Sequence, residues 1–292
     1  MASNNAHQFS ILILNPNTST HMTDALKPVL ESLRYSDVQF DYFTAPSRES
    51  ITLHDGHIIH GVPSINSGED SAQSALHCQP FMEPLVTRYD GFLVACYSAH
   101  PLVGLIKEGI RKHEETYPEA PSKYVTGIFE ASVLTSLSLI SSFQLTGGNS
   151  GLFDKAQTRE TFGIVSTGSV WETELNQAVR DMLISPDDKP NGTSTARFAG
   201  VATTGLTAVE LHTTSSEEVR QRIINATERF LQYTSGPVGA ICMGCAGMAG
   251  MEEAVREGCT RVYGAQQGRR VKIVDGVVAG AGMLVAACKA GF

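Results

Sequence analysis

Short apolar runs alternate with amphipathic segments of helical period along most of the chain. Four apolar runs, beginning at Phe9, Asp90, Thr161 and Val238, end in turns of small polar or glycine residues and are followed by a helical pattern. Strands that alternate with helices in this way are typical of α/β proteins with parallel sheets. Further strands are predicted at Val38–Phe43, Tyr124–Ile128, Ala199–Thr203 and Val271–Val274.

The spacing of these elements indicates an internal duplication. The strand that ends at Asn15 precedes Cys96 by 81 residues, and Ser166 precedes Cys245 by 79. In each half, a strand with a polar turn is therefore followed by a later strand that ends in cysteine. We expect two similar Rossmann-like or flavodoxin-like lobes, residues 1–121 plus 265–292 and residues 122–264, with short parallel sheets. The active site is expected in the cleft between them, at the carboxyl ends of the strands.

Composition and charge narrow the kind of partner. The 292 residues, of which 42% are hydrophobic and 18% charged, are typical of a globular protein of about two domains. A formal net charge of -8 argues against a nucleic-acid partner and favours a small-molecule substrate. The start, MASNNAHQ, lacks the basic segment of an export signal, and no apolar run is long and uninterrupted enough to span a membrane. We therefore expect a cytoplasmic protein whose six cysteines remain reduced.

Two cysteines are the strongest candidates for chemistry. Cys96 and Cys245 each follow a predicted strand where a helix is expected to begin, and backbone amides at such a position lower the pKa of a thiol. Glycines around Cys245, in MGCAGM, allow backbone amides to approach a ligand closely. Cys242 lies inside an apolar strand and is expected to be buried. The C-x-x-C spacing leaves a redox pair open, whereas a zinc site would need two further ligands that no nearby motif supplies.

Histidines and irregular segments give weaker signals. The histidines of HDGHIIH (His54, His57 and His60) fit a solvated loop better than a metal site. His100, four residues after Cys96, is an alternative base for a cysteine nucleophile. The irregular segment 44–75 is long enough to border or cover the cleft, and the polar stretch 185–198 is expected to be a surface loop. No phosphate-binding glycine motif follows a predicted strand, so no nucleotide cofactor is expected.

Several short motifs, taken together and in order, resemble one enzyme family. They are LILNPNTS, GVPSINSGED, VACYSAHPL, GIFEAS, FGIVSTGS, MGCAGM and VDGV. The chain resembles the hydantoin and allantoin racemases of the Asp/Glu/hydantoin racemase superfamily, including their fungal branch. The resemblance implies an isomerase that needs no cofactor and no metal, that assembles as a homo-oligomer and that acts in purine and nitrogen catabolism. It also implies that Cys96 and Cys245 are the two acid/base residues, which move a proton between the faces of a hydantoin-type ring.

The same resemblance implies a set of substrate-binding residues: Asn15, Ser64, Ile65, Ser98, Ser166, Thr167, Ala246 and Gly247. One departure concerns the substrate. Many bacterial members carry an acidic residue shortly after the first cysteine, where this chain has Ser98 and His100. The turn CAGM likewise offers no charge to hold a free amino acid, so allantoin or a 5-substituted hydantoin is favoured over aspartate or glutamate. The alternatives are a single-cysteine decarboxylase or cis-trans isomerase of the same superfamily, or a non-catalytic metabolite-binding protein.

Overall fold

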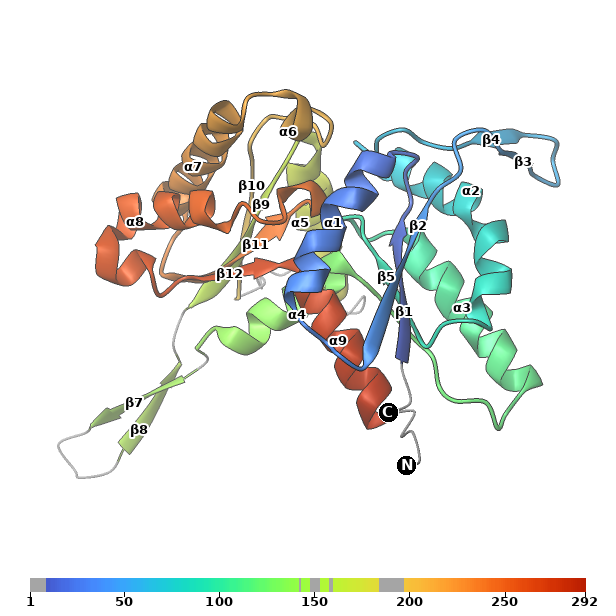
Figure 1. Ribbon diagram of the computed structural model, residues 1–292. Coiled ribbons are helices and arrows are strands. Elements are labelled where there is room, and N and C mark those ends of the chain that lie inside the picture. The colour runs from blue at the N-terminus through green and yellow to red at the C-terminus, as the bar shows by residue number, and fades with distance from the viewer. Residues whose placement is uncertain (1–8, 142, 148–152, 158–159, 184–196) are drawn as a thin grey trace.

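Two α/β lobes lie side by side, each built around a four-stranded parallel sheet (Figure 1). The computed structural model describes residues 9–141, 143–147, 153–157, 160–183 and 197–292. The strands of the first sheet are β2 (Val38–Thr44), β1 (Phe9–Asn15), β5 (Gly91–Val94) and β6 (Tyr124–Gly127), in that order. Those of the second are β10 (Phe198–Thr203), β9 (Thr161–Ser166), β11 (Val238–Gly244) and β12 (Lys272–Asp275).

Helices connect these strands and cover the sheets. They are α1 (Thr20–Ser32), α2 (Gly68–Val86), α3 (Pro101–Thr116), α4 (Ile128–Leu139), α5 (Val170–Leu183), α6 (Glu210–Thr213), α7 (Ser216–Tyr233), η1 (Ala246–Met248), α8 (Glu252–Gly268) and α9 (Gly276–Ala290). Two antiparallel hairpins complete the described part of the chain: β3 (Ser50–Thr52) with β4 (Ile58–His60), and β7 (Phe143–Gly147) with β8 (Phe153–Gln157). Most of the predicted surface loop at 185–198 lies outside the described residues.

The internal duplication is confirmed by the topology. If each lobe is numbered from its own first strand, both sheets have the order second, first, third, fourth. The central strands β5 and β9 are buried along their whole length, which explains why they are continuous apolar runs. In both sheets the carboxyl ends of the strands face the junction between the lobes, where the cysteine turns lie.

The chain exchanges a helix between the lobes at two equivalent points. β6 pairs with β5 in the first sheet, but the following helix α4 packs on β11 and β12 of the second. β12 pairs with β11, but α9 returns to pack on β5 and β6. The predicted lobe boundaries therefore need correction, because strand pairing puts residues 124–127 in the first lobe and 272–275 in the second. At Gly276, the first residue of α9, a Cβ would lie 2.5 Å from the carbonyl oxygen of Ile128, the first residue of α4. Only glycine therefore lets the starts of these two exchanged helices lie so close together.

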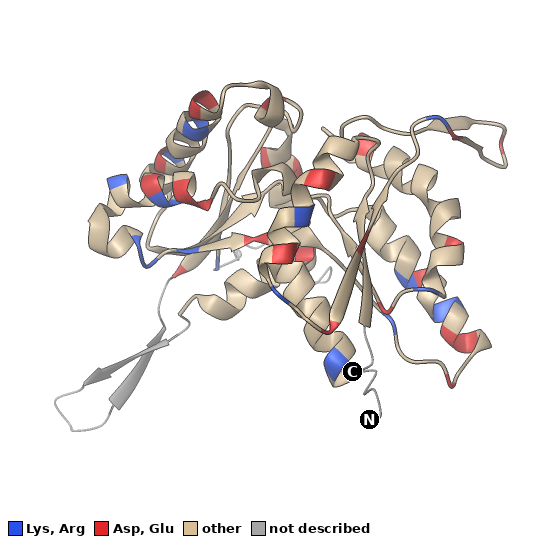
Figure 2. Ribbon diagram, viewed as in Figure 1, with Lys and Arg blue, Asp and Glu red and all other residues tan. Residues whose placement is uncertain are grey.

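The exchange joins the lobes through a shared hydrophobic core. One continuous cluster includes Ile13 of the first sheet, Phe162 of the second and Phe129 and Val277 of the exchanged helices. Separate clusters lie under α2 and α3 and under α7 and α8, on the outer side of each lobe. Charged residues are frequent on these outer helices, above all α3, α7 and α8 (Figure 2). None of the described helices has the length and apolar character needed to cross a membrane.

Candidate active site

A small cavity lies at the junction of the lobes, at the carboxyl ends of β5 and β11. Both candidate cysteines line it, together with residues from each lobe. Its lining consists of Asn17, Met22, Ile65, Ala95, Cys96, Tyr97, Thr167, Trp171, Ala208, Gly244, Cys245 and Ala246. The cavity measures about 30 Å³, roughly the room for one water molecule. Among the described residues, no Asp, Glu, Lys or Arg lines it.

Exposure separates the two cleft cysteines from the rest. Cys96 and Cys245 are partly exposed, whereas the other four cysteines are buried. Cys242 is fully buried within β11, and its Sγ lies 3.1 Å from Oγ of Ser136 on α4. The prediction that Cys242 is a core residue is therefore confirmed. A redox pair with Cys245 would need both thiols accessible, which this arrangement does not provide.

Cys96 is held by a side-chain hydroxyl. It lies two residues past the end of β5, and its Sγ is 3.6 Å from Oγ of Ser98. The Ser98 Oγ in turn lies 3.3 Å from Oγ of Ser71. Burial raises the pKa of the Cys96 thiol to about 12, although the hydrogen bond with Ser98 acts to lower it. The expectation of a helix start at this cysteine is wrong, because α3 begins only at Pro101.

Cys245 is held by the backbone. It is the N-cap of η1, and the amide of Gly247 donates a hydrogen bond to its Sγ at 3.3 Å. Burial raises the pKa of this thiol to about 11, against the lowering effect of the amides of Gly247 and Met248. A short helix thus begins at Cys245 as predicted. The predicted lowering of the pKa is wrong for both cysteines, because burial outweighs the donors and keeps both thiols protonated near pH 7.

Three of the predicted substrate-binding residues line the cavity, namely Ile65, Thr167 and Ala246. The other five do not line it: Asn15, Ser64, Ser98, Ser166 and Gly247. Asn15 is buried, and its amide nitrogen donates to Oδ1 of Asn17 at 3.0 Å. Ser166 is buried too, and its hydroxyl donates to the carbonyl oxygen of Gly244 at 2.6 Å. These side chains support the wall of the cavity rather than facing it.

Ser64 and Gly247 are placed differently from these supporting side chains. Ser64 lies in the segment after β4, with its Oγ 3.3 Å from Oδ1 of Asn66. Gly247 stands between Cys245 and α6, because a Cβ on it would lie 3.5 Å from Sγ of Cys245 and 3.0 Å from Nε2 of His212. Through Ile65, the long segment 44–75 does border the cavity.

Several lining residues escaped the sequence analysis, above all Asn17, Met22, Tyr97, Trp171 and Ala208. Asn17 stands in the quoted NPNTST turn, where only the structure separates the asparagine that faces the cavity from the one that supports it. Its amide nitrogen lies 3.4 Å from Sδ of Met22, a weak acceptor that a better one would displace. Tyr97 directly follows Cys96, and its hydroxyl is 2.7 Å from Oγ of Ser132 on α4.

The remaining histidine candidates serve local structure. His100 is the buried N-cap of α3: its Nδ1 accepts from the amide of Leu102, and its Nε2 lies 3.0 Å from Oγ of Ser74. Burial lowers the pKa of His100 to about 4, so the ring is neutral. Both ring nitrogens of His100 are therefore engaged with other groups. His100 is not placed to act as a base for Cys96. His54, His57 and His60 are exposed on and around the β3–β4 hairpin.

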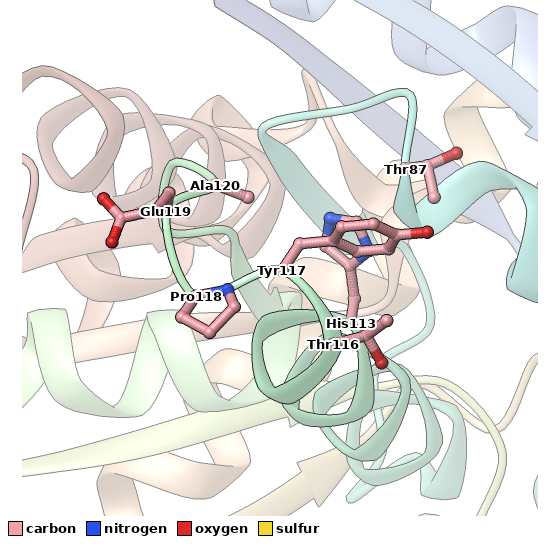
Figure 3. Close-up of a pocket in the computed structure, with 7 residues that line it drawn as sticks. All are labelled: Thr87, His113, Thr116, Tyr117, Pro118, Glu119 and Ala120. Carbon is pink, nitrogen blue, oxygen red and sulfur yellow. The ribbon is translucent and has the colours of Figure 1, made fainter.

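A second hollow lies far from the cysteines, at the carboxyl end of α3 (Figure 3). It is lined by Thr87, His113, Thr116, Tyr117, Pro118, Glu119 and Ala120, all from the first lobe. This hollow contains neither cysteine and no residue of the second lobe. It is therefore not the cleft that the duplicated sequence pattern predicts.

Comparison with known proteins agrees with the two-lobed architecture. A sequence model described as Asp/Glu/Hydantoin racemase matches residues 11–284, nearly the whole chain. The chain belongs to this racemase family. It is therefore a racemase, an enzyme of the isomerase class, as the sequence motifs predict.

Relatives and solved structures extend the comparison. A fungal relative, uncharacterized protein C1F7.10 of Schizosaccharomyces pombe, is 29% identical over 274 residues, which is 94% of this chain and 90% of the relative. The fold is similar to that of an allantoin racemase from Klebsiella pneumoniae, with a TM-score of 0.64, 21% identity, and 98% and 89% of the two chains covered. An allantoin racemase from Pseudomonas fluorescens gives a TM-score of 0.65 at 18% identity, with 97% and 92% covered.

Proposed function

We propose that this racemase interconverts the enantiomers of a neutral hydantoin-type ring, such as allantoin or a 5-substituted hydantoin, by 1,1-proton transfer between Cys96 and Cys245. One observation carries the proposal. The two partly exposed thiols, one from each lobe, line the same cavity, and none of the described residues that line it with them is charged. Thiols on opposing walls can reach the two faces of a ring held between them.

The reaction needs one thiolate and one thiol, so one of the two cysteines, both protonated near pH 7 in the free protein, must lose its proton before turnover. The thiolate removes the C5 proton, whose electrons pass into the adjacent carbonyl and form an enolate. The opposing thiol gives its proton to the other face of C5, which restores the carbonyl and inverts the centre. The two cysteines have then exchanged protonation states, so the return reaction uses the same groups in opposite roles. Each enantiomer has its own base, and no net proton is gained or lost.

Neutral donors around the cavity suit such a ring. The amide nitrogen of Asn17 and the side chain of Thr167 can bind ring carbonyls, and an amide aimed at the enolate oxygen stabilises it as its charge develops. A zwitterionic amino acid would bring two charges into a largely buried site without an ionic partner, which is costly. The allantoin racemases of similar fold support the same substrate class for this chain.

Substrate entry requires the lobes to separate. Binding sites for small molecules typically measure about 300 to 1,000 Å³, far more than the 30 Å³ of this cavity. Polar and ring contacts bridge the lobes near the cleft. The amide of Gly68 donates to Oε1 of Glu174 at 2.9 Å, and the ring of His21 on α1 lies edge-on to that of His212 on α6, with 4.9 Å between centroids. We therefore expect a more open form to admit the ring and the present arrangement to enclose it.

Proton exchange in heavy water tests the proposal against its alternatives. The protein is incubated with enantiopure allantoin, 5-ethylhydantoin, aspartate and glutamate, and optical rotation and deuterium at the reacting carbon are followed together. We expect both signals to change for the two rings and neither for the amino acids. Release of carbon dioxide from a malonate-type acid, or isomerisation of maleate, would instead support a single-cysteine lyase or isomerase. Tight binding of a ring without exchange would support a non-catalytic protein.

The cellular setting follows from the same chemistry. Two working thiols require a reducing compartment, and all six cysteines are unpaired in the structure. A cytoplasmic location is accordingly part of the proposal, as is a role in the catabolism of nitrogen-rich rings. Assembly into a homo-oligomer remains a prediction, which sedimentation of the purified protein would test.

A further inference from the structure

His212 carries a polar atom beside the cleft that has no hydrogen-bond partner among the described residues. His212 lies on the short helix α6, and its Nε2 is buried without a hydrogen bond anywhere in the described part of the chain. Folding removes the hydrogen bond that such an atom makes to water, and no protein group replaces it, which is rare for a buried nitrogen. A position of this kind is explained if a ligand supplies the missing partner.

The location of His212 connects it to the reacting thiol. A Cβ on Gly247 would lie 3.0 Å from Nε2 of His212 and 3.5 Å from Sγ of Cys245, so imidazole and thiol flank the same glycine. Ala208, four residues before His212, lines the cavity itself. The imidazole therefore stands on the Cys245 side of the site, at its border with α6.

The ring of His212 also contacts the other lobe. His21 packs edge-on against His212, with an interplanar angle of 89°. Burial, and secondarily the neighbouring His21, lowers the pKa of His212, so the imidazole is neutral at pH 7. A neutral imidazole offers at Nε2 either a donor or an acceptor, depending on the tautomer, and adds no charge to the site.

We propose that Nε2 of His212 hydrogen-bonds a polar substituent on the reacting carbon and thereby selects a ureido-bearing ring over an alkyl-bearing one. A urea group carries both N–H donors and a carbonyl acceptor, so it satisfies either tautomer. An alkyl substituent would cover the nitrogen and leave it unpaired. Sites built to hydrogen-bond a substrate discriminate strongly against analogues that lack the group, for this same reason. The inference rests on the proposed racemase activity and adds to it the group that sets the preference for the substituent.

The test compares two substrates across matched variants. Values of kcat and KM are measured for allantoin and 5-ethylhydantoin with the wild type, His212→Leu and His212→Gln. Glutamine can place a polar atom near the position of Nε2, whereas leucine cannot. We expect His212→Leu to reduce the preference for allantoin about tenfold, mainly through KM, and His212→Gln to retain it within about threefold. His21→Ala, which removes only the packing partner, serves as the control and should keep the preference.

Each of the following outcomes would overturn the inference. An unchanged preference in His212→Leu would show that Nε2 contacts no substituent. An equal loss in His21→Ala would show that the imidazole acts only through packing between the lobes. A fall in kcat for both substrates alike would assign His212 to the proton transfer rather than to selection. If the wild type racemises neither ring, the proposed function itself fails, and the role of His212 fails with it.

Discussion

The two lobes share one topology, yet they hold their cysteines by different means. Cys96 is paired with the hydroxyl of Ser98, whereas Cys245 receives the backbone amide of Gly247. A hydroxyl can both donate and accept a hydrogen bond, but an amide can only donate. The duplicated fold therefore places two equivalent sulfurs in unequal environments.

This difference bears on how each thiol carries its proton. The Ser71 hydroxyl donates to the carbonyl oxygen of Ser67, so it is free to accept from Ser98. When Cys96 is a thiol, it can donate to Ser98, which then donates to Ser71. When Cys96 is a thiolate, the Ser98 hydroxyl can turn and donate to sulfur instead. The amide at Cys245 favours the thiolate alone, and it acts to lower the pKa of this thiol against the effect of burial.

Removing either thiol gives the largest expected effect. Cys96→Ser and Cys245→Ser should each lower kcat for racemisation by about 10²- to 10⁴-fold, because each removes one acid/base partner. Circular dichroism of an enantiopure ring substrate measures the rate. Cys288→Ser, near the end of α9, is the matched control and should keep the parent rate. Parent activity in either cleft variant would contradict the two-thiol mechanism.

The pH dependence of alkylation separates the two environments. Below its pKa, the thiolate fraction of a cysteine rises about tenfold per pH unit, and so does its reaction with iodoacetamide. Cys245, whose sulfur receives the amide of Gly247, should therefore be alkylated at a lower pH than Cys96, while burial raises the pKa of both thiols. Mass spectrometry of the two peptides measures both rates in one sample. Identical profiles would remove the asymmetry on which the comparison depends.

The same raised pKa values predict a loss of stability in alkali. An unfolded thiol ionises at about 8.5, whereas the folded protein keeps both protons until pH 11 to 12. The folded state thus binds more protons above pH 8.5, and the free energy of unfolding falls as pH rises through this range. Urea denaturation at pH 7 and pH 10 measures the fall. It should be smaller in the Cys96→Ser, Cys245→Ser double variant, and an equal fall would assign the effect to other groups.

Substitution of the serine partners should give a graded, smaller effect. Ser98→Ala removes the side-chain hydroxyl bonded to Cys96 and should lower kcat/KM about tenfold, with slower alkylation of Cys96 but not of Cys245. Ser71→Ala leaves Ser98 in place and should lower kcat/KM about threefold. Ser138→Ala on the exposed side of α4 is the control. If alkylation of both cysteines slows equally in Ser98→Ala, the serine acts on the cleft as a whole.

The smallest expected effect concerns the contact between the lobes. Glu174→Ala removes the acceptor for the amide of Gly68, an exposed hydrogen bond between the rims of the cleft. We expect a change in KM of about two- to threefold with kcat almost unchanged, because such a bond is worth little in water. Glu115→Ala, on the outer helix α3, is the control. A large drop in kcat would instead show that closure of the lobes is part of the chemical step.

The fold class and the position of each cleft cysteine just after a strand were predictable because they depend on local patterns. Apolar runs followed by amphipathic segments are sufficient to predict β1, β5, β9 and β11, and the similar spacing of the two halves predicts the duplication. The lobe boundaries were not predictable in this way. Whether Tyr124–Gly127 joins the first or the second sheet depends on pairing with a strand distant in sequence. Nothing in the local pattern says that the following helix crosses to the other lobe.

The features of the site also fall into those that local patterns predict and those that depend on tertiary contacts. The sequence alone determined the alternation of strands and helices, the two matched cysteine turns and the absence of charge in the turn CAGM, because residue type and spacing record these directly. Only the tertiary structure decided that Asn17 faces the cavity while Asn15 supports it, and that Ser98 contacts Cys96. It also placed His212 beside Gly247. These choices depend on the directions of side chains and on contacts between segments far apart in the chain, which no local pattern encodes.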